Sequence, residues 1–140
     1  IHSRHFSWGE NEKETVVRGA RKDILAAFFH VYNTLGYGFL EKVYENALAL
    51  SPRKLGRKVS QQAHVSVFFE EQMVGDYFAD LIVDNSVVVE VKAAEAIHPA
   101  HEAQLLNYLR ATEIEVGLLL NFGEKPQFSR KILTNDRKGF

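Results

Sequence analysis

The sequence predicts a single mixed α/β domain with its elements in the order α-α-β-β-β-α-β. Apolar residues recur at helical spacing in the first third of the chain, and the period then changes to two between residues 62 and 83. The fully apolar run at 116–121 is typical of a strand covered on both faces of a sheet. A length of 140 residues, with no internal repeat or low-complexity tract, agrees with one domain.

Composition excludes several classes of protein. The chain has no cysteine, so disulfides and thiolate metal sites are excluded. Its 17 basic and 18 acidic residues argue against a generic nucleic-acid coat protein but not against an enzyme that acts on nucleic acid. No run of about 18 apolar residues exists, and residues 1–5 lack the apolar stretch of a signal peptide. We therefore expect a cytoplasmic protein with no membrane partner.

The first helix is predicted to follow a flexible tail at residues 1–11. Asn11 and Glu14 have the spacing of a capping box, and apolar residues then recur at helical intervals up to Leu35. Gly36 supplies a stop signal.

Two more helices are predicted. The first has an apolar stripe from Leu40 to Leu50; Pro52 should kink or end its last turn, and Gly56 closes the segment. The other begins at Pro99, a residue favoured in the first turn of a helix, and ends near Ala111.

Strands account for the remaining regular structure. Alternating or continuous apolar residues predict strands at 62–69, 74–83, 87–92 and 116–121, and a further edge strand at 128–133. The folded domain is expected to span residues 12–134, followed by a polar tail at 135–140.

Three charged residues interrupt two otherwise apolar strands. Glu90 and Lys92 lie two apart and therefore point to the same face, and Asp80 is the one charged residue in the preceding apolar segment 77–83. Such a pattern also arises by chance and is harmless on an edge strand. The alternative is a functional carboxylate pair with a lysine beside it.

The length of one loop decides whether the carboxylates meet. If residues 84–86 form a three-residue loop, Asp80 lies directly opposite Glu90 with Cβ atoms roughly 5 Å apart. A two-residue loop would place them on opposite faces. Facing carboxylates on a buried sheet require a shared proton, a basic neighbour or a hard divalent cation such as Mg²⁺ or Mn²⁺.

Polar residues on the second and third helices are further candidates. Glu41 lies at the opening of the second helix, between Gly38 and Tyr44, where the helix dipole alone would explain an acidic residue. Gln104 and Tyr108 share one side of the third helix, either as an ordinary polar border or as a hydrogen-bonding pair that orients a catalytic group. His101 is expected to be a cap or a surface residue.

Five segments together resemble one known family. They are Gly38–Tyr44 (GFLEKVY), Gly75–Leu81 (GDYFADL), Glu90–Lys92 (EVK), His101–Leu109 (HEAQLLNYL) and Gly117–Gly123 (GLLLNFG). The resemblance is to the GxxExxY proteins, a prokaryotic branch of the PD-(D/E)XK nuclease superfamily, and it covers residues 15–134. Ala79 stands in place of the proline that names the superfamily.

The resemblance implies a fold and a set of site residues. The fold is a restriction-endonuclease-like αβββαβ core, here with an additional N-terminal helix. The implied metal ligands are Glu41, Asp80, Glu90 and the Val91 carbonyl, and the implied catalytic residues are Lys92, Gln104 and Tyr108. Lys92 is expected to stabilise charge rather than to act as a base, because adjacent carboxylates favour its charged form.

The expected function is hydrolysis of phosphodiester bonds in nucleic acid, DNA or RNA with DNA favoured, assisted by Mg²⁺ or Mn²⁺. A second reading is a nucleic-acid-binding or assembly module that keeps the site with little activity and forms a homo-oligomer. A third is a metal-dependent hydrolase of a phosphoester that is not a nucleic acid. Four basic residues near the end of the chain are candidate phosphate contacts: Arg130, Lys131, Arg137 and Lys138.

Overall fold

The structure, a computed structural model, describes residues 2–139, and side chains are described from residue 12 onward. Its helices are α1 (His2–Leu35), α2 (Glu41–Lys54), α3 (Pro99–Arg110) and a short 3-10 turn, η1 (Asn135–Arg137). Its strands are β1 (Val59–Phe69), β2 (Gln72–Val83), β3 (Val87–Lys92), β4 (Val116–Phe122) and β5 (Pro126–Ile132). The predicted α/β class and order of elements are confirmed, and the predicted last edge strand is present as β5.

The strands form a mixed sheet in the order β1-β2-β3-β4-β5. Only β3 and β4 pair in parallel, and α3 makes the crossover between them. The other neighbours are antiparallel. Val83 pairs with Val87, so the residues between them form the predicted three-residue loop and the predicted register is confirmed.

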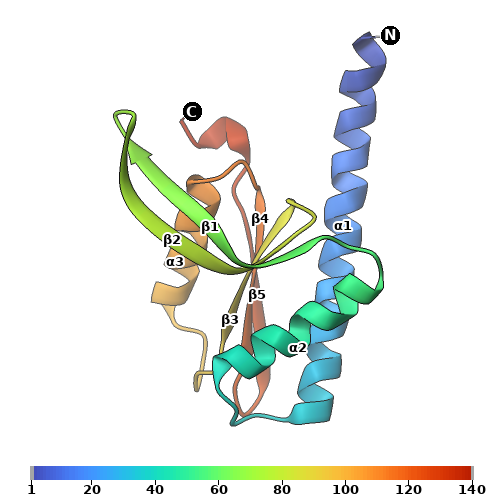
Figure 1. Cartoon of the computed structure of the whole chain (residues 1–140), viewed down its shortest axis with the longest axis vertical. Helices are drawn as coiled ribbons and strands as arrows, with labels where there is room; N and C mark the ends of the chain where they lie inside the picture. Colours follow the sequence, from blue (N-terminus) through green and yellow to red (C-terminus); the bar gives the residue numbers. More distant parts are fainter. Residues whose placement is uncertain (1, 140) are drawn as a thin grey trace.

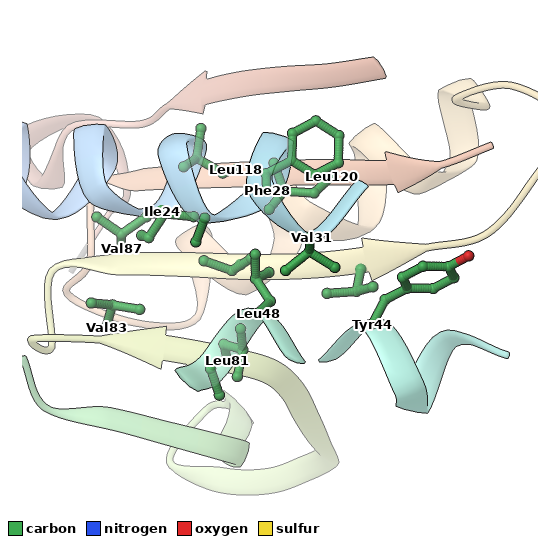
Figure 2. Close-up of a cluster of buried hydrophobic side chains, with 14 of the residues drawn as sticks. Ile24, Phe28, Val31, Tyr44, Leu48, Leu81, Val83, Val87, Leu118 and Leu120 are labelled. Carbon is green, nitrogen blue, oxygen red and sulfur yellow. The ribbon is translucent and has the colours of Figure 1, made fainter. Parts of the chain in front are cut away.

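Helices cover both faces of the sheet, as Figure 1 shows: α1 and α2 lie on one face and α3 lies on the other. Figure 2 shows the core on the first face, where Ile24 and Phe28 of α1 and Leu48 of α2 meet the strands. On the second face, Leu105 and Leu109 of α3 are fully buried against the sheet. Because helices cover both sides of β3 and β4, nearly all residues of these strands are apolar. The few polar residues in them, Glu90, Lys92 and Asn121, are therefore exceptions that need an explanation.

Both ends of the chain differ from the predicted tails. The α1 helix begins at His2 rather than at Asn11; no proline interrupts residues 2–11, and the one glycine there costs a helix only about 1 kcal/mol. Near the other end, the segment predicted as a polar tail forms η1 and then buries Lys138, whose Nζ donates to the carbonyl oxygens of Thr112 (3.0 Å) and Ile114 (2.7 Å). Residues 1 and 140, which belong to the two predicted tails, lie outside the described residues.

The α2 helix ends at Lys54, two residues after Pro52 and before Gly56, as the sequence predicts. Pro52 is buried in the last turn, where its carbonyl oxygen accepts hydrogen bonds from the N–H groups of Leu55 and Arg57. The proline therefore sits close to the helix end, where fewer backbone bonds depend on it.

The β1–β2 hairpin extends beyond the helices. Figure 1 shows its outer half projecting away from α1 and α2, and the first seven residues of β2 are mostly exposed whereas the last five are mostly buried. No helix in the described part of the chain combines the length and apolarity that crossing a bilayer requires.

Candidate active site

Asp80 and Glu90 meet where β2 and β3 separate. The backbone pairing of the two strands ends at Leu81 and Val89. Beyond that pair, side chains take over the bonding: the Asp80 N–H donates to Glu90 Oε2 (2.8 Å), and the Val91 N–H donates to Asp80 Oδ2 (2.8 Å). Each carboxylate thus accepts a hydrogen bond from the backbone of the other strand.

Burial makes this pair electrostatically unfavourable. Glu90 is only 3% exposed, and its burial, followed by the charge of Asp80, raises its pKa to about 8. Burial also raises the pKa of Asp80, and the hydrogen bond from Val91 opposes that shift. The site therefore favours a proton or a cation between the two carboxylates.

Lys92 and Glu41 face the same region. The charge of Lys92 lowers the pKa of both Asp80 and Glu90, so the half-buried lysine lies within electrostatic range of the pair. Glu41, in the first turn of α2, is exposed. Burial raises the pKa of Glu90 and lowers the pKa of His101, and the charge of Glu41 adds to the first shift and opposes the second. Among the described side chains, no three His, Cys, Asp or Glu residues are gathered closely enough to hold a metal ion. The structure thus joins two of the three predicted carboxylate ligands and leaves Glu41 nearby, at the surface.

Two polar residues that the sequence reading did not select connect α2 to this pair. Glu45 is buried, and its carboxylate accepts hydrogen bonds from Lys42 (3.2 Å), Gln61 (2.9 Å) and Gln62 (2.8 Å). Gln62 also donates to Asp80 Oδ1 at 3.3 Å, from a backbone with φ of +50° that leaves it out of the β1–β2 pairing. The sequence gives only a weak indication of these two residues. Glu45 lies one helical turn after Glu41, and Gln62 belongs to a Gln-Gln pair at the start of the alternating strand.

Tyr44 explains the spacing of the GxxExxY-like segment. The fully buried ring stacks on Phe122 with centroids 4.2 Å apart. Its hydroxyl donates to the Gly36 carbonyl oxygen (2.7 Å) and accepts from the Phe39 N–H (3.2 Å). The tyrosine therefore fixes the loop that precedes α2, and with it the position at which Glu41 enters the helix.

Tyr44→Phe is expected to lower the free energy of unfolding by about 1–2 kcal/mol, because both loop hydrogen bonds are lost. Urea unfolding followed by circular dichroism measures the stability. Tyr37→Phe, which changes an exposed hydroxyl in the same loop, is the matched control and should have no effect. Equal stability of the two variants would contradict the role given to Tyr44.

The loop after β3 is fixed by Asn121, a buried amide on β4. Asn121 Oδ1 accepts from the Ala94 N–H (2.9 Å), and its Nδ2 donates to the Ala94 carbonyl oxygen (3.0 Å). Gly123 permits the same close approach, since a Cβ atom there would lie 2.5 Å from that carbonyl oxygen. This clamp sets the path from Lys92 to α3.

Gln104 and Tyr108 form a bonded pair on α3. Gln104 Nε2 donates to Tyr108 Oη at 3.2 Å. Burial, and then the charges of Glu90 and Asp80, raise the pKa of Tyr108, so this pair borders the carboxylates. His101 accepts a hydrogen bond from the His98 N–H (3.2 Å) and therefore caps α3, as expected.

Of the basic residues expected to meet phosphate, Lys131 is paired with Glu102 (2.5 Å) and Lys138 is buried against carbonyl groups.

The donor set suits a hard divalent cation. Asp80 and Glu90 offer carboxylate oxygens, the ligand type that Mg²⁺ and Mn²⁺ prefer, and a cation would offset the repulsion that raises the pKa of Glu90. Val91 is fully buried next to the pair, and its N–H is already bonded to Asp80.

The order of the elements defines an α/β domain in which Asp80 and Glu90 meet between two strands. A family model described as the PD-(D/E)XK nuclease superfamily matches residues 18–132, and the chain belongs to this superfamily. No curated protein matches the chain. The crystal structure of SSO0001 is similar with a TM-score of 0.48 and 14% identity over 87% of this chain; the chain spans about 65% of the length of that protein.

Proposed function

We propose that the chain hydrolyses phosphodiester bonds of nucleic acid, with DNA favoured, and requires Mg²⁺ or Mn²⁺. The observation that carries the proposal is the Asp80–Glu90 pair with Lys92 in the same region, in a chain of the PD-(D/E)XK nuclease superfamily. The Asp80 N–H donates to the Glu90 carboxylate, and the Val91 N–H donates to the Asp80 carboxylate. The proposed branch within the superfamily is GxxExxY, on the residues Gly38, Glu41 and Tyr44. A prokaryotic origin and a cytoplasmic location belong to the same proposal, and a homo-oligomer belongs to the alternative of a binding or assembly module.

The carboxylates and the Val91 carbonyl are the proposed cation ligands. Asp80 and Glu90 would hold the ion, and Glu41 would turn toward it from the first turn of α2. A bound divalent cation supplies positive charge beside the scissile phosphate and lowers the pKa of water.

The other side chains act on the phosphate and on the geometry of the site. The Lys92 ammonium would stabilise the negative charge that develops on the phosphoryl oxygens as water attacks and the leaving oxygen departs. Gln104 would bond to the phosphate or to the attacking water, and Tyr108, which accepts its Nε2–H, would hold the Gln104 amide in place.

A cleavage assay on DNA and RNA, single-stranded and duplex, tests the proposal. We expect cleavage with Mg²⁺ or Mn²⁺, no cleavage with EDTA, and none by Asp80→Asn, whereas Asp76→Asn on the exposed part of β2 should cleave normally. Cleavage by Asp80→Asn at the rate of the unchanged protein would overturn the site. Cation binding by calorimetry without cleavage of any nucleic acid would favour the binding module instead.

A further inference from the structure

A groove of about 990 Å³ lies between the β1–β2 hairpin, α3 and the residues that follow η1. This volume is at the upper end of the range of about 300–1,000 Å³ found for small-molecule sites. Aromatic rings line it from two sides: Phe68 and Tyr77 come from the hairpin, and Tyr108 comes from α3. Phe68 is 64% exposed and Tyr77 is 51% exposed, so a large part of each side chain is accessible to a ligand.

The charge of the groove favours an anionic ligand. None of the described residues that line it is Asp or Glu, although the chain as a whole has one more acidic than basic residue. The lining includes Arg110, Lys138 and His101. A second groove, of about 560 Å³, mixes both signs, with Glu14, Glu113, Glu115, Lys13, Arg18, Arg21 and Arg130 in its lining.

The aromatic groove leads to the carboxylate pair. Tyr77 and Tyr108 have ring centroids 6.3 Å apart, and Tyr108 is bonded to Gln104. Tyr108 lies within range of the charges of Glu90 and Asp80. The lining of the groove therefore includes the Gln104–Tyr108 pair that borders the two carboxylates.

Exposed aromatic faces distinguish single strands from duplexes. Unpaired bases stack on aromatic side chains, whereas the bases of a duplex are already stacked on one another. A duplex would be held through its phosphates, which requires many cationic side chains. In this groove Lys138 Nζ is already bonded to two carbonyl oxygens, and Arg110 donates to Asn107 (3.1 Å). The groove therefore offers exposed aromatic rings, whereas these two cationic side chains already have hydrogen-bond partners, and this favours a single strand over a duplex.

We propose that this groove binds single-stranded nucleic acid, with bases stacked on Phe68 and Tyr77 and the backbone leading past Gln104 toward Asp80 and Glu90. As the substrate path of a nuclease, the inference rests on the proposed function, but binding itself is measurable without cleavage. With two cationic residues in the groove, the slope of log affinity against log salt for a single strand should be no steeper than about −1.4.

The hairpin supplies matched control variants. Phe69 is 64% exposed and Phe78 is 52% exposed, close to Phe68 and Tyr77, but neither lines the groove. Fluorescence anisotropy of a labelled oligo(dT) in EDTA measures binding by the full chain without cleavage. Phe68→Ala and Tyr77→Ala are expected to weaken binding by about 5- to 150-fold each, the usual effect of losing one base–aromatic stack. Phe69→Ala and Phe78→Ala should bind as the unchanged protein does.

Further variants and ligands separate the possible outcomes. Tyr77→Leu keeps apolar bulk without a ring and should bind as weakly as Tyr77→Ala, and thermal melts verify that each variant is folded. The inference is overturned if oligo(dT) does not bind, if the matching duplex binds more tightly, or if groove and control variants lose affinity equally. If the groove variants lose binding but no nucleic acid is cleaved with Mg²⁺, the proposed nuclease function fails while the groove stands. Cleavage that is the same for all four variants contradicts the groove alone.

Discussion

Lys92→Met is expected to reduce cleavage by about 10²- to 10³-fold, the usual cost of removing one positioned charge-stabilising group from an active site. Lys92 lies on β3 two residues after Glu90, on the same face, and its charge opposes the burial that raises the pKa of both carboxylates. Methionine keeps a flexible apolar chain of similar length but removes the charge. The initial rate of cleavage at saturating Mg²⁺ measures the effect.

Two further variants identify the property that matters. Lys92→Arg keeps the positive charge and should retain part of the activity, although its planar guanidinium does not reproduce the geometry of the ammonium. Lys54→Met removes an exposed lysine at the end of α2 and should leave cleavage unchanged. Cleavage by Lys92→Met at the rate of Lys54→Met would remove Lys92 from the mechanism.

The carboxylate pair could be predicted because it depends on few choices. Strand alternation places Glu90 and Lys92 on one face, and the three-residue loop sets the register that brings Asp80 opposite. The surrounding strands are apolar because helices cover both sides, so charged residues in them were conspicuous.

The contribution of α2 was harder to predict. Glu45 contacts Gln62 and Gln61, which are 17 and 16 residues away in the chain, and only the packing of α2 beside β1 brings them together. Gln62 also leaves the strand pairing at a positive φ, a local departure that alternation does not predict. Lys138 was assigned to a tail because its charge suggested exposure, but two free carbonyl oxygens after α3 bind it.

Glu90→Gln is expected to have opposite effects on stability and on activity. In EDTA at pH 8 it should raise the free energy of unfolding by on the order of 2–4 kcal/mol, because it removes a buried charge beside Asp80. The glutamine Oε1 can still accept the Asp80 N–H, so the strand contact is kept. Cleavage should be lost with the cation ligand. Urea unfolding at several pH values measures the stability.

The pH dependence of the free energy of unfolding shows whether Glu90→Gln stabilises the protein by removing a buried charge or by improving the packing. The pKa of Glu90 is raised from 4.5 in the unfolded chain to about 8 in the folded protein, so between these values the folded state binds more protons. Stability conferred by the protonated group is therefore complete below about pH 4.5 and is lost as pH rises through 8. Glu90→Gln should match the unchanged protein near pH 5 and exceed it at pH 8, with Glu95→Gln, an exposed loop variant, showing no difference at either pH.

Added Mg²⁺ should reverse the order. A cation that binds the folded state alone stabilises it, and only the protein that retains Glu90 has the full carboxylate pair to bind one. At pH 8 the unchanged protein should thus gain stability on addition of Mg²⁺, while Glu90→Gln gains little. Glu90→Gln that is less stable than the unchanged protein in EDTA at pH 8 would mean that the carboxylate supports the fold, and the interpretation of the pair as a strained cation site would be wrong. The predicted reversal follows because the same repulsion that costs folding energy without a cation supplies the affinity for one.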